Sequence, residues 1–153
     1  MFRVVLDSNV IARAVMSPNG LAADLLTLLV KSEHQLCTSD FMLAELVRVL
    51  SYPQLQKRHR LDDQKIAAFV RSIQQASIVV EVDAQSAPQV TRDINDDPVV
   101  ETVILSSSQY LCSLDKDILA QAVVKYCQTQ GITPILIGQE ATLQIEHIET
   151  VSN

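Results

Sequence analysis

The stretch that decides the fold is Phe2-Arg3-Val4-Val5-Leu6-Asp7, an apolar run that ends in a carboxylate. A short apolar run of this length is typical of a buried central strand. A carboxylate directly after such a strand is costly to bury unless another group pairs with it. The run therefore predicts a central strand and, at its carboxyl end, the first candidate site residue.

Outward from this stretch, the chain of 153 residues alternates between extended and helical patterns. Ser17-Pro18-Asn19-Gly20 predicts a turn, and Pro53 marks a break. Apolar periodicity predicts helices over residues 21–31, 39–50, 62–75, 98–104, 118–126 and 139–149. Extended runs predict strands over residues 35–38, 78–82, 110–112 and 133–137, and the polar stretch 83–96 predicts a loop.

This alternation predicts an α/β fold, a three-layer α/β/α sandwich around a central, mainly parallel sheet. About half of the residues (48%) are hydrophobic and none is Trp, so the core is expected to be aliphatic. No linker or repeat divides the chain, and we expect residues 1–153 to form a single domain. In such a sheet, ligands bind beyond the carboxyl ends of the strands.

Composition also narrows the class of protein. The net charge of −6 argues against simple electrostatic binding of nucleic acid, although metal ligation would offset part of it. The three cysteines match neither a disulfide framework nor a zinc pattern, and we expect reduced, mostly buried thiols. No apolar run has the length of a membrane span or an export signal, so we expect a cytoplasmic protein with no membrane partner.

Three acidic residues fall where a parallel sheet would gather them. Asp7 follows the first strand, Asp115 follows the strand at 110–112, and Asp97 precedes Pro98 at a helix start. Helix starts follow strand ends in this architecture, so the three are expected at one edge of the sheet. Asp97 and Asp115 also have a simpler interpretation as helix N-caps, which needs no catalysis.

Glu45 is the fourth candidate. It lies off the apolar stripe of Leu43, Leu46, Val47 and Leu50, yet its helical neighbours Phe41, Met42 and Val49 are apolar. A carboxylate in such surroundings needs a partner, which a metal ion or a metal-binding acid cluster would supply, unless the side chain leans outward into solvent. Clustered carboxylates repel one another, so at least one is expected to resist ionisation.

Four segments, in order along the chain, resemble the motifs of the PIN-domain family, and most closely its branch of toxins from toxin–antitoxin operons. They are Val5-Leu6-Asp7-Ser8-Asn9-Val10, Phe41-Met42-Leu43-Ala44-Glu45-Leu46, Arg92-Asp93-Ile94-Asn95-Asp96-Asp97-Pro98 and Leu111-Cys112-Ser113-Leu114-Asp115-Lys116-Asp117-Ile118-Leu119. Arg48-Val49-Leu50-Ser51-Tyr52-Pro53 and Ile132-Thr133-Pro134-Ile135-Leu136 are also similar to the family, so the resemblance covers almost the whole chain.

Two positions depart from the family pattern. Ser113-Leu114-Asp115 stands where the family often has Thr-Gly-Asp, and Glu101 and Thr102 stand where it usually has small apolar residues. Leu114 can alter the loop. Glu101, one turn after Asp97, is either an extra ligand or merely exposed.

The resemblance implies hydrolysis of RNA phosphodiester bonds with Mg²⁺ or Mn²⁺, since carboxylates are hard oxygen ligands. The expected catalytic residues and metal ligands are Asp7, Glu45, Asp97 and Asp115. The expected supporting residues are Asn9, Ser113, Asp93, Asp96 and Asp117, and the candidate RNA contacts are Arg48, Lys57, Arg58 and Arg60. The resemblance further implies a homodimer and a small antitoxin as partner.

Two other functions remain open. The first is a degenerate PIN module that binds RNA or protein without cutting, against which the four retained acids argue. The second is a phospho-acceptor signalling domain, which also places an Asp at a strand end. That fold normally has an acidic pair early in the chain and a lysine after a late strand, and neither is evident in this sequence.

Overall fold

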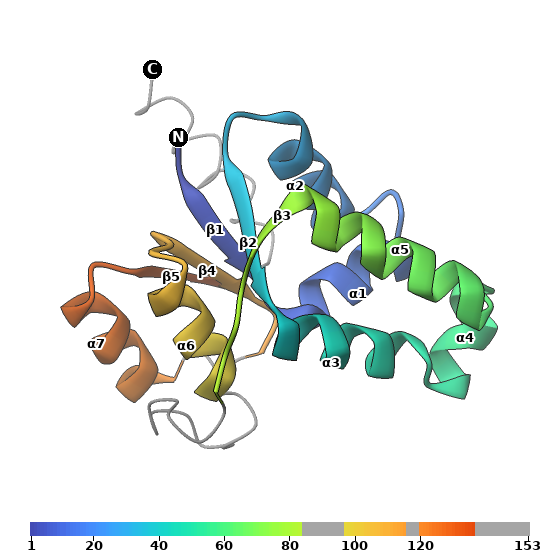
Figure 1. The fold of residues 1–153 in the computed structure, drawn as a ribbon. Helices are drawn as coiled ribbons and strands as arrows, with labels where there is room; N and C mark the ends of the chain where they lie inside the picture. Colours follow the sequence, from blue (N-terminus) through green and yellow to red (C-terminus); the bar gives the residue numbers. More distant parts are fainter. Residues whose placement is uncertain (84–96, 116–119, 137–153) are drawn as a thin grey trace.

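The computed structural model describes residues 1–83, 97–115 and 120–136, and its core is one parallel sheet (Figure 1). The strands are β1 (Arg3–Leu6), β2 (Gln35–Ser39), β3 (Ser77–Val80), β4 (Tyr110–Ser113) and β5 (Thr133–Leu136). They are all parallel, in the order β3-β2-β1-β4-β5. The first strand of the sequence is therefore the central strand, as the apolar run predicts.

Helices cover both faces of this sheet (Figure 1). They are α1 (Ser8–Met16), α2 (Leu21–Lys31), α3 (Asp40–Leu50), α4 (Pro53–His59), α5 (Asp63–Ala76), α6 (Asp97–Leu105) and α7 (Gln121–Thr129). Val4 and Leu6 of β1 pack with apolar residues of α1, α2, α3 and α5, whereas Val5 packs with those of α6 and α7. Successive side chains of a strand point to opposite faces, so one strand joins both cores. The predicted α/β sandwich is confirmed.

Several predicted elements have the expected ends. Helix α2 occupies the predicted residues, and Ser39 caps α3 by accepting a hydrogen bond from the Met42 backbone N–H at 3.2 Å. Asp62 caps α5 in the same way, accepting from the Lys65 N–H at 2.8 Å. Each cap satisfies a backbone donor that the first turn of a helix leaves free.

Two helices were not indicated by the sequence pattern. Helix α1 buries Val10, Ile11, Ala12 and Ala14 and leaves Asn9 and Arg13, one turn apart, exposed. Helix α4 has Pro53 at its first turn. Proline is tolerated there because its missing N–H would have no intrahelical partner, so Pro53 begins a helix instead of only ending one.

Smaller differences concern element ends. The strand predicted over 78–82 runs from Ser77 to Val80, and α6 begins at Asp97 itself instead of after it. Asp115 does not cap α7, whose N-cap is Ala120. Residues 84–96 of the loop predicted over 83–96, residues 116–119 and the predicted helix over 139–149 lie outside the described residues.

The three thiols are buried and free, as expected. Burial raises the pKa of the Cys112 thiol to about 12 and also raises that of Cys127, which makes both poor nucleophiles. None of the helices in the described ranges has the length and apolar character of a membrane span.

Candidate functional site at the carboxyl edge of the sheet

The pairing of β1 with β4 brings Asp7 and Ser113 together. Leu6 lies opposite Cys112, and the Asp7 backbone N–H donates to the Cys112 carbonyl at 2.9 Å, so the ladder continues beyond the strand end. The Ser113 hydroxyl donates to Asp7 Oδ2 at 2.9 Å and accepts from the Asp115 backbone N–H at 2.9 Å. One buried hydroxyl thus fixes the Asp7 carboxylate and the loop that carries Asp115.

Asp7 is a buried carboxyl among other acids, with 3% of its surface exposed. Its pKa is raised from 3.8 to about 6, mainly because burial disfavours the charged form. The charges of Glu45 and Asp115 add to the rise, whereas hydrogen bonds from Ser113 and from the Ser8 backbone N–H oppose it. The fold therefore places three of the four expected acids close enough to repel, and Asp7 resists ionisation as expected, although burial contributes more to this than repulsion between the acids does.

Glu45 reaches this cluster from α3, and it also contacts two residues that the sequence did not indicate as its partners. The Ser8 hydroxyl lies 3.1 Å from Glu45 Oε2 and 3.2 Å from the Met42 carbonyl, and Arg48 lies 3.6 Å from Glu45 Oε1. Glu45 is half-buried, with its side chain 22% exposed. Ser8 and Arg48, which is one turn along the same helix, thus contact Glu45 in addition to the neighbouring acid Asp7, and metal ligation by Glu45 stays a prediction.

Ser8 is a site residue that sequence reasoning did not single out. It is buried at the first position of α1, directly after Asp7. Its position as the small hydroxyl residue after the strand-end acid was visible in the sequence, but its contact with residues 42 and 45 requires the packing of α1 against α3.

Asp97 is buried, with 3% of its surface exposed, at the start of α6. That helix packs against β1, β2 and α3, and Thr102 is hydrogen-bonded to Ser39, the last residue of β2, at 2.9 Å. This position supports a place near the same edge of the sheet. Asp97 does not figure among the groups that shift the pKa of Asp7, so the structure joins three acids and leaves the fourth as a prediction.

The other predicted site residues are scattered. Asn9 is exposed and lines the same groove as Asp115, although within the described ranges it makes no hydrogen bond to Asp7 or Asp115. Arg48 is paired with Glu45, Lys57 and Arg58 are exposed on α4, and Arg60 caps that helix in the left-handed region at φ 60°. Asp93, Asp96 and Asp117 lie outside the described residues.

The residues present fit a hard divalent cation by their chemistry. Carboxylate oxygens are the ligands that Mg²⁺ and Mn²⁺ prefer, and the raised pKa of Asp7 reports excess negative charge that a cation would neutralise. Within residues 1–83, 97–115 and 120–136, no three His, Cys, Asp or Glu side chains are already spaced to hold one ion. The oxygen donors are thus chemically suitable for a divalent cation, but among these residues three ligands are not close enough together to hold one ion.

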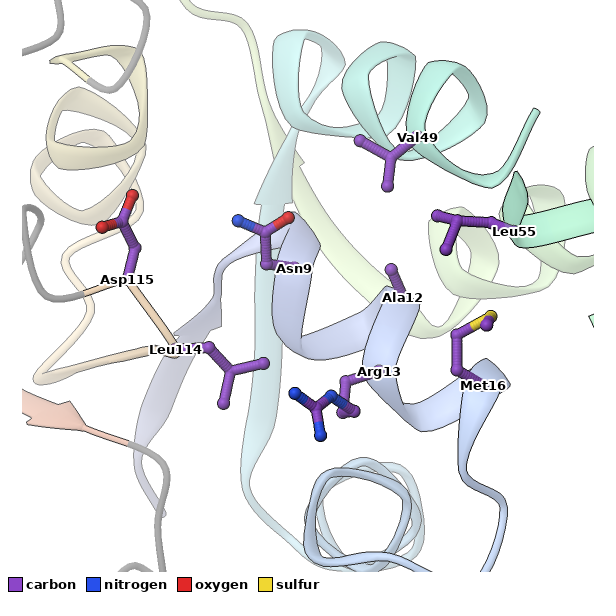
Figure 2. A pocket seen from close by; sticks show the side chains of 8 residues that line it. All are labelled: Asn9, Ala12, Arg13, Met16, Val49, Leu55, Leu114 and Asp115. Atoms are coloured by element: carbon purple, nitrogen blue, oxygen red, sulfur yellow. The ribbon is translucent and has the colours of Figure 1, made fainter. Parts of the chain in front are cut away.

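A groove of about 390 Å³ adjoins the acids (Figure 2). Asp115 lines one end of it, and Asn9 and Arg13 of α1 contribute its other polar groups. The remaining lining is apolar and comes from α1, α3, α4 and the loop after β4. Among the expected acids, Asp115 is therefore the one that lines this open groove.

Replacing Ser113 by alanine is expected to lower the free energy of unfolding by about 2 kcal/mol at pH 7.5, since it removes a hydrogen bond to a charged group and orphans the Asp115 N–H. The pKa of Asp7 should rise further, because Ser113 stabilises the ionised form. The difference in unfolding free energy between the wild type and Ser113→Ala should decrease below pH 6, where Asp7 is protonated in both proteins. Urea titrations at pH 5.5 and 7.5 measure both effects, with Ser51→Ala as the control, since Ser51 is a half-buried serine at the end of α3 that contacts none of the acids. A loss equal to that of the control would contradict the assigned hydrogen bonds.

A buried strand-end acid, two further carboxylates and a parallel sheet define an α/β domain with an acidic site. The sequence matches the family model of the PIN domain over residues 3–117, so this chain belongs to the PIN-domain family. The fold is similar to the crystal structure of VapBC2 from Rickettsia felis bound to a DNA fragment from their promoter. That comparison has a TM-score of 0.57 at 13% identity and covers 89% of this chain and 99% of the other. No protein of curated function matches the sequence.

Proposed function

We propose that this protein is a metal-dependent endoribonuclease that hydrolyses RNA phosphodiester bonds. PIN domains are generally nucleases, which supports hydrolysis of nucleic acid. The observation that carries the proposal is the state of Asp7, a buried carboxyl whose pKa burial and two nearby carboxylates raise to about 6. Such a costly arrangement is typical of a functional site, since a fold under no such demand would replace the acid.

In this proposal Asp7, Asp115 and Asp97 hold Mg²⁺ or Mn²⁺, and Glu45 ligates the ion or orients water. The bound ion would lower the pKa of the attacking water and neutralise charge on the phosphate. Ser113 orients Asp7, and Ser8 orients Glu45. Arg48, already next to Glu45, is placed to leave that carboxylate for an RNA phosphate.

The direct test is cleavage of labelled RNA by the purified protein with Mg²⁺, with Mn²⁺ and with a chelator. Cleavage should require the metal, should produce internal cuts, and should follow the protein through a final sizing column. Glu45→Gln should reduce the rate, whereas Glu33→Gln, an exposed acid remote from the site in sequence and on the loop before β2, should not. Equal rates for the two variants, or cleavage in the chelator, would argue for a contaminant.

Metal binding should also stabilise the fold. At a Mg²⁺ concentration ten times its dissociation constant, the native state gains about 1.4 kcal/mol, which raises the melting temperature by roughly 3–5 °C. Protons compete with the metal at Asp7, so the gain should be larger at pH 8 than at pH 5.5. Differential scanning calorimetry measures it. A melting temperature indifferent to both Mg²⁺ and Mn²⁺ would count against the site.

One observation favours a second candidate, a PIN module that binds RNA without cutting it. Arg48 is paired with Glu45, and among the described residues no three potential ligands are spaced for one ion. This candidate predicts RNA binding that a chelator leaves unchanged, together with intact RNA in every metal. The cleavage assay therefore separates the two functions.

The biological setting we propose is the toxin of a toxin–antitoxin pair. The sequence resemblance to that branch supports it, as does the fold shared with VapBC2 of Rickettsia felis. A small antitoxin encoded beside the gene should copurify with this chain and suppress its cleavage of RNA. If the small protein copurifies with this chain but does not suppress RNA cleavage, the nuclease function is still supported and the toxin assignment is contradicted. A homodimer remains part of the proposal and is tested by sedimentation.

A further inference from the structure

The groove beside the acids is built by one face of α1 and three facing segments. Asn9, Ala12, Arg13 and Met16 follow one another at helical spacing, so they form one continuous side of the groove. Figure 2 shows Val49 of α3, Leu55 of α4 and Leu114 of the loop after β4 around the same space. Its volume of about 390 Å³ lies in the usual range for small-molecule sites, roughly 300–1,000 Å³.

The groove is continuous with the acidic site. Asp115 lines the groove, and its backbone N–H donates to the Ser113 hydroxyl, which itself donates to Asp7 Oδ2. On α1, Asn9 directly follows Ser8, which contacts Glu45. On α3, Val49 lies one turn after Glu45. A ligand group held in the groove would therefore lie next to a phosphate held by the acids.

The chemistry of the groove is that of a base-binding site. Its wall is apolar, formed by Ala12, Met16, Val49, Leu55 and Leu114, and it offers the Asn9 amide and the Arg13 guanidinium as polar groups. Unpaired bases are held on proteins by apolar or planar side chains and by hydrogen bonds to their edges.

The charges around the groove favour a polyanion as the occupant. Arg13 is exposed and forms no ion pair within the described part of the chain. Helix α4, which supplies Leu55, also carries exposed Lys57 and Arg58. An acidic backbone that enters the groove would meet Arg13 in its lining, and Lys57 and Arg58, which do not line the groove, add positive charge on the neighbouring helix, in a protein whose net charge is −6.

We infer that this groove is a subsite for one unpaired nucleobase, adjoining the phosphodiester that the acids receive. The inference rests on the proposed function and deepens it by naming what is recognised beside the cut. Leu114, which stands where the family often has glycine, supplies apolar surface that glycine would lack. A base in a duplex has its edges paired and its faces stacked, so the groove selects single-stranded RNA.

The test measures RNA binding in the Asp7→Asn background with Mg²⁺, so that the RNA stays intact. Two fluorescein-labelled ligands of the same length are compared by anisotropy: a single-stranded oligoribonucleotide, and a ribose-phosphate chain without bases. The groove variant is Val49→Ala with Leu55→Ala. The matched control is Val47→Ala with Leu21→Ala, which removes the same side chains at exposed positions outside the groove.

The groove variant should bind the oligoribonucleotide roughly five- to tenfold more weakly and the base-free chain as well as before, because stacking surface and not charge is lost. The control should bind both as before. Thermal unfolding checks that each variant is folded, and Leu55→Asn alone replaces the double variant if that variant is not. Equal losses for both ligands, or no loss for either, would overturn the inference and leave the groove to a protein partner.

These outcomes are separable from those of the proposed function. If the groove binds RNA in a base-dependent way but the wild-type protein never cleaves RNA, the subsite is supported and the nuclease function is contradicted. If the wild type cleaves RNA in a metal-dependent way but the groove variant binds RNA as the wild type does, the nuclease function is supported and the subsite is contradicted.

Discussion

Replacing Asp7 by asparagine is expected to stabilise the protein at pH 7.5, by roughly 2 kcal/mol. The rise of the Asp7 pKa from 3.8 to about 6 corresponds to about 3 kcal/mol, because each pH unit is worth about 1.4 kcal/mol. An amide has the same shape and no charge to desolvate, and it can still accept from the Ser113 hydroxyl. It gives up part of the hydrogen bonding to the Ser8 N–H, which offsets about 1 kcal/mol.

The sign of the pH dependence follows from the direction of the shift. The folded protein binds the Asp7 proton more tightly than the unfolded chain does, so this proton contributes stability that is complete below pH 3.8 and is lost as pH rises through 6. The advantage of the asparagine variant should therefore shrink steadily between pH 6.5 and 4.5.

Urea unfolding in a chelating buffer, at several pH values, measures this difference. Asp24→Asn is the matched control, since Asp24 is an exposed acid in the first turn of α2 and its replacement should change stability by less than about 0.5 kcal/mol. A variant that is no more stable than the wild type at pH 7.5, or whose gain is the same at every pH, would show that Asp7 is an ordinary solvated acid.

The same substitution should lower the rate of RNA cleavage by roughly a thousandfold, equivalent to about 4 kcal/mol in the barrier. Asp7 is the acid at the centre of the cluster, fixed by Ser113 and close to both Glu45 and Asp115. An amide offers one neutral oxygen to the cation in place of a charged pair. Single-turnover cleavage of labelled RNA measures the loss, and raising the Mn²⁺ concentration should recover part of it if weakened metal binding is the cause.

Asp24→Asn again serves as the control and should cut at the wild-type rate. Asp115→Asn should lose activity less severely, because Asp115 lies on the loop and is more exposed than Asp7. Cleavage that survives in Asp7→Asn would contradict its assignment as a metal ligand. A variant that is more stable and less active than the wild type is the pattern expected when a site is kept at the expense of stability.

Much of the fold and part of the candidate site can be predicted from the sequence, because local sequence patterns determine them. The apolar run that ends at Asp7 predicts the central strand, and the alternation of helices and strands predicts the parallel sheet. The parallel sheet then places Asp7 and Ser113 side by side, since the carboxyl ends of adjacent parallel strands share one edge.

The remainder depends on packing between helices, which spacing alone does not reveal. Helix α1 follows the central strand after a single residue, and the sequence pattern did not separate it from that strand. The partner of Glu45 could not be named because Ser8 reaches it only through the contact of α1 with α3. Asn9 lines the same groove as Asp115, and its role in orienting the acids stays a prediction.

The most direct test of the convergence of these acids on a cation is the titration of the Asp7 carboxyl carbon by NMR, with and without Mg²⁺. We expect the titration midpoint of Asp7 near pH 6 in a chelating buffer and at lower pH as Mg²⁺ is added. The titration midpoint of Asp24 should not change on addition of Mg²⁺. A midpoint near pH 4 that ignores Mg²⁺ would show that no shared acidic site exists around Asp7.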